Sequence, residues 1–302
     1  MYDILIIGGG PAGLTAAVYA LRAGKSVLVI EKNGFGGQIA FSPKVENIPG
    51  TQQISGAAFA EALVEQAMAL GADVELEAVT SLEKTENGFA AVTEEGSTFE
   101  GKAAILALGV KHRLLGLEGE EDLIGNGLSF CAVCDGAFYA GQEVAMIGGG
   151  NSALQEALLL SEVCSKVTIV QNLAFLTGEK KLADALAEKD NVTILYSTVV
   201  SAYESRDGVL CGLKLHNDET GEDSRISVDG AFLAVGLQPE NDPFAKWADL
   251  NDWGYFDSAE DCCTKTEGVF VAGDCRSKRI RQVVTAASDG AIAAMAACRW
   301  LD

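Results

Sequence analysis

A strand, a glycine-rich turn and a helix, in this order, occur twice in the chain and constrain its fold more than any other feature. The first copy has an apolar run at 2–7, the turn GGGPAG at 8–13 and helix-forming residues at 14–23. Gly8 permits a tight turn, Gly10 lets backbone amides approach a pyrophosphate, and Gly13 allows close packing of helix and strand. The helix N-terminus then faces the phosphate charge. This order predicts a dinucleotide-binding unit.

The strand expected next, at 26–30, ends at Glu31. A carboxylate at this position can accept hydrogen bonds from both hydroxyls of a ribose, and its charge opposes a 2′-phosphate. The first unit therefore favours a dinucleotide with a free ribose.

The second copy has a strand-like run at 143–147, a turn that contains Gly148, Gly150, Asn151 and Ser152, and a helix at 154–161. Its next strand, at 166–170, runs into Gln171, so there is neither a carboxylate for a free ribose nor an arginine for a 2′-phosphate. A nucleotide-type fold can persist without its nucleotide, so binding of NADH or NADPH at this turn stays open. Lys180 and Lys181 either supply positive charge nearby or are solvated residues at a helix start.

The remaining pattern predicts an α/β fold with two Rossmann-like domains of three layers (ββα), the second inserted into the first. Short strands are expected at 74–77, 89–93, 97–99 and 103–108, and a buried strand at 268–274 is followed by a helix at 285–301. We assign residues 1–113 and 240–302 to a discontinuous FAD-binding domain. Residues 114–239 form a pyridine-nucleotide-type domain that carries a CxxC motif.

Composition excludes several classes of function. With 22 basic and 43 acidic residues the formal charge is −21, which repels nucleic acid phosphates and anionic membranes. No apolar run has the length of a membrane span, and the first one lacks the basic flank of a signal peptide. Eight cysteines in a chain of this length without an export signal favour reduced thiols and a cytoplasmic location.

Cys131 and Cys134 form the motif with the most specific chemistry, because two intervening residues allow a small disulfide ring when a helical turn brings the thiols together. A zinc site would need two further ligands, from His112, His216 or the adjacent Cys262 and Cys263, and none of these has ligand spacing. A pair of merely packed cysteines is the other alternative. The context favours a redox pair, and we predict no metal. Cys164, Cys211, Cys275 and Cys298 are expected to be packed thiols.

Taken together, these motifs resemble the low-molecular-weight, bacterial-type thioredoxin reductases along nearly the whole chain. The matching stretches are 8–13, GGQ at 36–38, VENIPG at 45–50, CAVCDG at 131–136, GVFVAGD at 268–274, RQV at 281–283 and TAA at 285–287. The resemblance implies a homodimeric flavoprotein enzyme that binds FAD and reduces thioredoxin or a thioredoxin-like protein.

The resemblance also implies roles for individual residues. Cys134 would lie nearest the flavin, Cys131 would attack the partner disulfide and Asp135 would act as acid and base. Glu31 would hold the adenosine ribose, Val79 would contact adenine, Asp274 would hold the ribityl or pyrophosphate part, and Gln282 with Val283 would meet the flavin ring. The full set implied to bind FAD is Gly8, Gly10, Pro11, Ala12, Gly13, Glu31, Gly37, Gln38, Asn47, Val79, Gly273, Asp274, Gln282 and Val283.

The chain departs from this family where NADPH-linked members carry a histidine and an arginine cluster. Residues 170–176 read VQNLAFL, and each lost charged hydrogen bond to a 2′-phosphate costs about 1.5–3 kcal/mol. The electron donor therefore stays open between NADH, weakly held NADPH and ferredoxin. Arg276, Lys278, Arg279 and Arg281 are the one obvious basic cluster for docking ferredoxin, or they border the flavin. A non-catalytic redox-sensing flavoprotein is the alternative outside enzymes.

Overall fold

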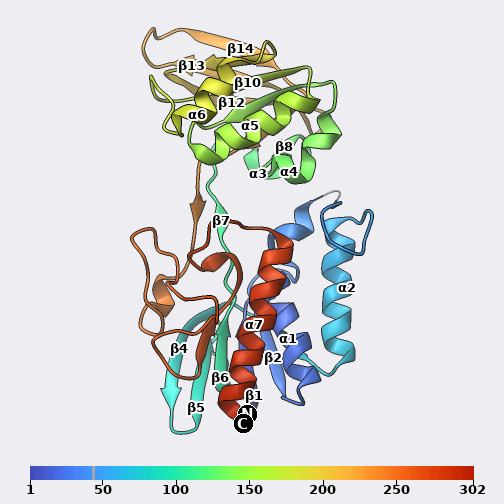
Figure 1. Ribbon diagram of the computed structural model, residues 1–302, viewed down its shortest axis with the longest axis vertical. Helices are drawn as coiled ribbons and strands as arrows, with labels where there is room; N and C mark the ends of the chain where they lie inside the picture. The colour runs from blue at the N-terminus through green and yellow to red at the C-terminus, as the bar shows by residue number, and fades with distance from the viewer. Residues whose placement is uncertain (43–44) are drawn as a thin grey trace. The chain divides into compact units, whose positions relative to one another are not determined.

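The computed structural model describes residues 1–42 and 45–302. The chain divides into two compact units (Figure 1). Unit 1 comprises Met1–Lys111 and Gln238–Asp302, and unit 2 comprises His112–Leu237. Each unit places a mainly parallel sheet against helices, so both have the Rossmann-type α/β fold predicted from the glycine turns.

The sheet of unit 1 has seven strands in the order β3-β2-β1-β6-β5-β4, with β17 paired to β6. β1, β2, β3, β6 and β17 run parallel, whereas β4 and β5 form an antiparallel hairpin that continues onto β6. The strands are β1 (Tyr2–Ile7), β2 (Val27–Glu31), β3 (Asp73–Leu76), β4 (Val79–Thr85), β5 (Gly88–Thr93), β6 (Thr98–Leu106) and β17 (Val269–Val271).

Hydrophobic side chains fill both faces of this sheet. On one face, alternate residues of β1 such as Ile4 and Ile6 pack with α1 and α7. On the other face, Leu5 and Ile7 pack with Phe89 of β5 and with Trp247 and other residues from the last part of the chain. The helices are α1 (Pro11–Arg22), α2 (Gly56–Ala69) and α7 (Val283–Leu301), with short 3-10 turns η1 (Gly37–Phe41), η3 (Asp242–Phe244) and η4 (Gly273–Cys275).

Unit 2 has a parallel sheet in the order β11-β10-β9-β15-β8 and a separate antiparallel sheet β12-β13-β14. One hydrophobic cluster joins the two sheets, and another lies between the parallel sheet and the helices. The strands are β8 (Leu128–Ser129), β9 (Glu143–Ile147), β10 (Lys166–Val170), β11 (Val192–Leu195), β12 (Thr198–Arg206), β13 (Val209–Asn217), β14 (Asp223–Ser227) and β15 (Gly230–Leu233). The helices are α3 (Glu120–Leu123), α4 (Ala132–Asp135), α5 (Asn151–Val163) and α6 (Lys180–Ala187), with η2 (Gly136–Tyr139). Two short strands, β7 (Lys111–His112) and β16 (Leu237–Gln238), pair with each other.

The structure differs from the sequence prediction between 79 and 108. Two strands were expected at 97–99 and 103–108, but one strand, β6, spans both. The polar residues between them are held in the sheet because Gly101 pairs with Tyr2 of β1 on one side and with Phe89 of β5 on the other. β4 was not predicted as a strand. Among the described residues, no helix has the length and apolarity to cross a membrane.

Candidate functional site: a disulfide and two glycine turns

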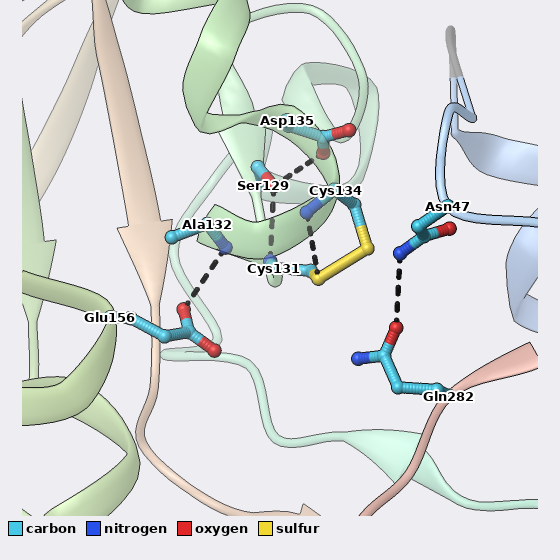
Figure 2. Close-up of a disulfide and its surroundings, with 8 residues drawn as sticks. All are labelled: Asn47, Ser129, Cys131, Ala132, Cys134, Asp135, Glu156 and Gln282. Carbon is cyan, nitrogen blue, oxygen red and sulfur yellow. Dashed lines mark hydrogen bonds between the residues drawn. A yellow bond between two sulfur atoms is a disulfide. The ribbon is translucent and has the colours of Figure 1, made fainter. Parts of the chain in front are cut away.

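The CxxC motif forms a disulfide in unit 2. Cys131 and Cys134 are bonded with their Cα atoms 5.3 Å apart, at either end of the turn that opens α4 (Figure 2). Cys131 is the residue that precedes the first helical residue, and its Sγ accepts a hydrogen bond from the Cys134 amide at 3.2 Å. An amide directed at a sulfur stabilises negative charge on it, so this geometry favours a thiolate at Cys131 once the disulfide is reduced.

Two polar side chains near the disulfide, those of Ser129 and Asp135, are joined by a hydrogen bond. Ser129 donates from its hydroxyl to Asp135 Oδ2 at 2.6 Å and accepts the Cys131 amide at 3.1 Å (Figure 2). Asp135, predicted as acid and base, is therefore held by a buried serine that also holds the backbone of Cys131. Sequence reasoning missed Ser129, because a lone serine two residues before a cysteine carries no recognisable signal.

Glu156 is a second carboxyl group at this turn that the sequence did not single out. It lies on α5, and its Oε2 accepts the amide of Ala132, inside the CxxC motif, at 3.3 Å (Figure 2). Burial, and to a smaller degree the nearby Asp135 charge, raise the pKa of Glu156 to about 7. A proton can thus be exchanged at this carboxyl group near neutral pH.

The other six cysteines are free thiols. Burial raises the pKa of Cys164 and Cys275 to about 11 and that of Cys262 to about 12, so these thiols stay protonated and unreactive at neutral pH. Within residues 1–42 and 45–302, no group of three or more histidine, cysteine or acidic side chains is arranged to hold a metal ion.

The first glycine turn joins β1 to α1 in unit 1. A Cβ atom at Gly8, whose φ is +110°, would lie 2.2 Å from the Ala107 carbonyl oxygen, and one at Gly13 would lie 1.9 Å from the Gly8 carbonyl oxygen. Gly10 precedes α1, and a Cβ atom there would meet the Gly37 Cα at 3.9 Å, an ordinary van der Waals contact. Pro11 is the first helical residue. Sterics within the unit thus require glycine at Gly8 and Gly13 but not at Gly10, where the glycine agrees with close approach of a pyrophosphate to the backbone.

Glu31 ends β2 beside this turn. Its Oε2 accepts the Gly9 amide at 2.7 Å, and its Oε1 accepts the Asn33 amide at 3.1 Å. The carboxylate is therefore fixed, ready to accept further hydrogen bonds from hydroxyl groups. Gly37 and Gln38 begin η1, which follows this stretch.

Asp274 lies in η4, next to the same turn. A Cβ atom at Gly273 would lie 2.8 Å from the Cβ of Ala12, so the two backbone segments are in close contact. Asp274 Oδ1 is buried and has no hydrogen-bond partner, and burial raises the pKa of this carboxyl group. A buried acceptor without a donor costs about 1–3 kcal/mol, which a ligand hydroxyl would recover. The residues present therefore fit FAD.

The other predicted FAD contacts occupy two further places in unit 1. Asn47 Nδ2 donates to Gln282 Oε1 at 3.1 Å (Figure 2), and Gln282 precedes α7, of which Val283 is the first residue. Val79 begins β4, and β6 and β5 separate it from β1 in the sheet order. A hydrogen bond thus joins Asn47 with Gln282, and close packing joins Gly273 with Ala12, whereas Val79 lies apart on β4.

The second glycine turn repeats the sterics of the first with a different residue beside it. A Cβ atom at Gly148 would lie 2.5 Å from the Ala234 carbonyl oxygen, and Gly150 precedes α5, which begins at Asn151 and Ser152. Gln171, which follows β10, is buried, and its amide donates to the Phe175 carbonyl oxygen at 2.9 Å. The second unit therefore has a neutral side chain, Gln171, at the place that corresponds to Glu31 in the first unit.

Positive charge near the second turn is scarce. Lys180 begins α6, where it is largely exposed and pairs with Asp184 at 2.8 Å, and Lys181 is exposed. The two lysines thus behave as solvated residues at a helix start, one of them neutralised by its own helix.

The basic cluster at 276–281 is mostly internal. Arg276 is buried, with Nη1 2.9 Å from Asp289 Oδ1, and Lys278 Nζ lies 2.9 Å from Asp289 Oδ2. Arg281 stacks on Tyr255 at 4.2 Å and donates to the Asp274 carbonyl oxygen. Only Arg279 of the four is exposed. These four residues therefore do not form an exposed basic patch, because Arg276, Lys278 and Arg281 are engaged in contacts within unit 1.

Comparison with known proteins yields one family and a consistent set of relatives. Residues 2–290 match the family described as pyridine nucleotide-disulphide oxidoreductase. The chain is 37% identical over 304 residues to the thioredoxin reductase of Bacillus subtilis, covering 100% of this chain and 95% of that protein. It is also 36% identical over 299 residues to the 34.2 kDa protein in the rubredoxin operon of Clostridium pasteurianum, covering 99% of this chain and 97% of that one.

Solved structures agree with this result. The thioredoxin reductase of Streptococcus pyogenes is 36% identical, covers 100% of this chain and 98% of its own, and superposes with a TM-score of 0.92. The thioredoxin reductase of Lactococcus lactis in its FR conformation is 33% identical, covers 100% of this chain and 99% of its own, and superposes with a TM-score of 0.70.

Proposed function

Because the chain belongs to the pyridine nucleotide-disulphide oxidoreductase family, we propose that it is a flavin-dependent thioredoxin-disulfide reductase. Membership of this family implies FAD and a pyridine nucleotide as cofactors. Electrons would pass from a reductant through FAD and the Cys131–Cys134 pair to thioredoxin or a thioredoxin-like protein. The observation that carries this proposal is the Cys131–Cys134 disulfide at the start of a helical turn that also contains Asp135.

The first glycine turn and its surroundings would hold FAD. Gly10 and the amides that open α1 would bind the pyrophosphate, and Glu31 would accept the adenosine ribose hydroxyls. Asp274 Oδ1 would gain the hydrogen-bond donor that it lacks. Gln282 and Val283 would meet the flavin ring, and Val79 the adenine. Bound FAD would supply the electron pair that reduces the disulfide.

Reduction of the disulfide consumes two electrons and leaves one thiolate and one thiol, or two thiols after a second protonation. The Cys134 amide would stabilise the thiolate at Cys131, which then attacks a sulfur of the partner disulfide and releases the other sulfur. Asp135 would give the proton to that leaving sulfur and take one from Cys134. Cys134 would then attack Cys131, which frees the reduced partner and re-forms the disulfide.

For the electron donor, we propose that NADPH is not bound through its 2′-phosphate as in members with an arginine clamp. Neutral Gln171 at the end of β10 and the Lys180–Asp184 pair support this view. NADH, which lacks that phosphate, loses nothing by the absence of a clamp. Ferredoxin remains the protein donor to compare with it.

The test uses the oxidised protein with bound FAD under anaerobic conditions. It is mixed separately with NADPH, NADH and reduced ferredoxin, and bleaching of the visible flavin band is followed. We expect NADPH to reduce the flavin with a rate constant lower than the turnover rate of the enzyme. Flavin reduction by NADPH at a rate that matches turnover would overturn the donor proposal. The reduced protein is then mixed with oxidised thioredoxin and with other disulfide-containing thioredoxin-like proteins. Failure to reduce any of them would leave the redox-sensing flavoprotein as the better description.

We further propose a homodimer in the cytoplasm. The six free thiols support a reducing compartment, since only one pair among the eight cysteines is oxidised. The resemblance to thioredoxin reductases supports the dimer, which sedimentation would test directly.

A further inference from the structure

Glu156 has no part in the steps above, yet its carboxyl group accepts a hydrogen bond from the backbone of the CxxC motif. It comes from α5, whereas Asp135 directly follows the motif in sequence. Glu156 Oε2 accepts the Ala132 amide at 3.3 Å (Figure 2). Ala132 follows Cys131 directly, and the Cys134 amide of the same turn donates to Cys131 Sγ at 3.2 Å. One short turn therefore serves both a carboxylate and a sulfur with its amides.

Reduction changes the charge at this turn. While the disulfide is intact, the sulfurs are neutral and an ionised Glu156 is the acceptor of the Ala132 amide. When a thiolate forms at Cys131, a second negative charge appears one residue from that amide. Two like charges in a poorly solvated site cannot both persist cheaply, so the pKa of the carboxyl group rises when the thiolate forms.

Resting on the proposed function, we propose that Glu156 is a positioning residue that takes up a proton when the Cys131–Cys134 disulfide is reduced and releases it when the disulfide re-forms. The balanced step adds two electrons and two protons to the disulfide and the Glu156 carboxylate. It gives one thiolate, one thiol and one carboxylic acid. Glu156 thereby carries the proton that would otherwise neutralise the attacking sulfur, and Cys131 stays a nucleophile.

The groups around Glu156 are consistent with this role. Burial, and after it the charge of Asp135, raise the pKa of Glu156 to about 7 in the oxidised form, so the carboxyl group is already half protonated at neutral pH. Tyr139 of η2 has its own pKa raised by burial and stays neutral. The other charged groups of the elements packed against α5 are exposed: Glu143 on β9, Lys166 on β10, and Lys180, Lys181 and Asp184 on α6.

The redox equilibrium of the dithiol as a function of pH tests the proposal. The protein with bound FAD is equilibrated in thiol–disulfide buffers from pH 6 to 9, quenched with an alkylating reagent, and analysed by mass spectrometry for modified Cys131 and Cys134. Each proton taken up on reduction changes the equilibrium constant tenfold per pH unit, which is about 30 mV for a two-electron couple. Above pH 7, the equilibrium constant of the wild-type protein should depend on pH more steeply than that of Glu156→Gln. The difference should be about one additional factor of ten per pH unit, which corresponds to one additional proton.

Glu162→Gln is the matched control, because Glu162 lies on the same helix but is exposed. It should keep the wild-type slope. Parallel slopes for the wild type and Glu156→Gln would overturn the proposal, even if the protein reduces thioredoxin. If Cys131 and Cys134 do not exchange with the buffer at all, the proposed function fails as well.

A second measurement needs no substitution and so does not depend on folding of a variant. Infrared difference spectra of the oxidised and reduced protein are recorded at pH 7.5, with and without ¹³C in the glutamate side-chain carboxyl groups. We expect a carboxylic acid band to appear on reduction and to shift with glutamate labelling, which separates Glu156 from Asp135. Absence of a label-sensitive band would overturn the proposal.

Discussion

Replacing Asp289 by asparagine removes the negative charge at the centre of a buried network in unit 1. Its carboxylate lies 2.9 Å from both Arg276 Nη1 and Lys278 Nζ, and it accepts the Gly273 amide at 3.1 Å. The three side chains are only 8%, 10% and 13% exposed for Arg276, Asp289 and Lys278. Removing one partner of a buried pair costs about 3–5 kcal/mol, because the remaining charge is left without compensation. We expect Asp289→Asn to lower the free energy of unfolding of unit 1 by this amount.

The assay can be confined to unit 1. Trp247, Trp253 and Trp300, all the tryptophans of the chain, lie in unit 1, so tryptophan fluorescence in urea reports its unfolding at a fixed FAD concentration. Asp249→Asn is the matched control, since Asp249 pairs with Lys265 at 2.7 Å but the two side chains are 65% and 41% exposed. An exposed pair contributes at most about 1 kcal/mol. If Asp289→Asn loses no more stability than Asp249→Asn, the reasoning from burial is refuted.

Two further predictions concern unit 2. Cys131→Ser should abolish disulfide reduction while the protein retains FAD, as measured by its visible spectrum after gel filtration; loss of the flavin would show that the disulfide is structural. Burial lowers the pKa of His112 to about 4, and its ring stacks on Phe130 with centroids 4.3 Å apart. An unfolded histidine titrates near 6.5, so stability present above pH 6.5 is lost as the pH falls towards 4, by up to about 3 kcal/mol. His112→Phe keeps the stack and should flatten this part of the pH profile in urea titrations followed by circular dichroism; an unchanged profile would contradict the assignment.

Local patterns predicted the framework of the site, and long-range contacts supplied what the patterns could not. The strands before both glycine turns and the CxxC motif could be read from the sequence, because apolar period and glycine position act over a few residues. The burial of Arg276 could not be predicted from the sequence, because it depends on an ion pair with Asp289, which lies on α7. Glu156 was missed for the same reason: its partner amide lies 24 residues away in the chain. Sequence spacing also suggested a surface cluster at 276–281, since it carries no information about which cations turn inward.

The two glycine turns separate what fixes a fold from what selects a ligand. At Gly8 and at Gly148, a side chain would collide with the carbonyl oxygen of Ala107 and Ala234 respectively, so packing within each unit demands glycine whether or not a nucleotide binds. Packing alone therefore accounts for glycine at these two positions. We propose that the ligand is selected at the end of the following strand, where Glu31 offers a fixed carboxylate and Gln171 a buried amide that is hydrogen-bonded to its own loop. On this proposal a charged clamp at the second turn would have to replace that loop, and the electron donor would change with the residues after β10 while both folds stay intact.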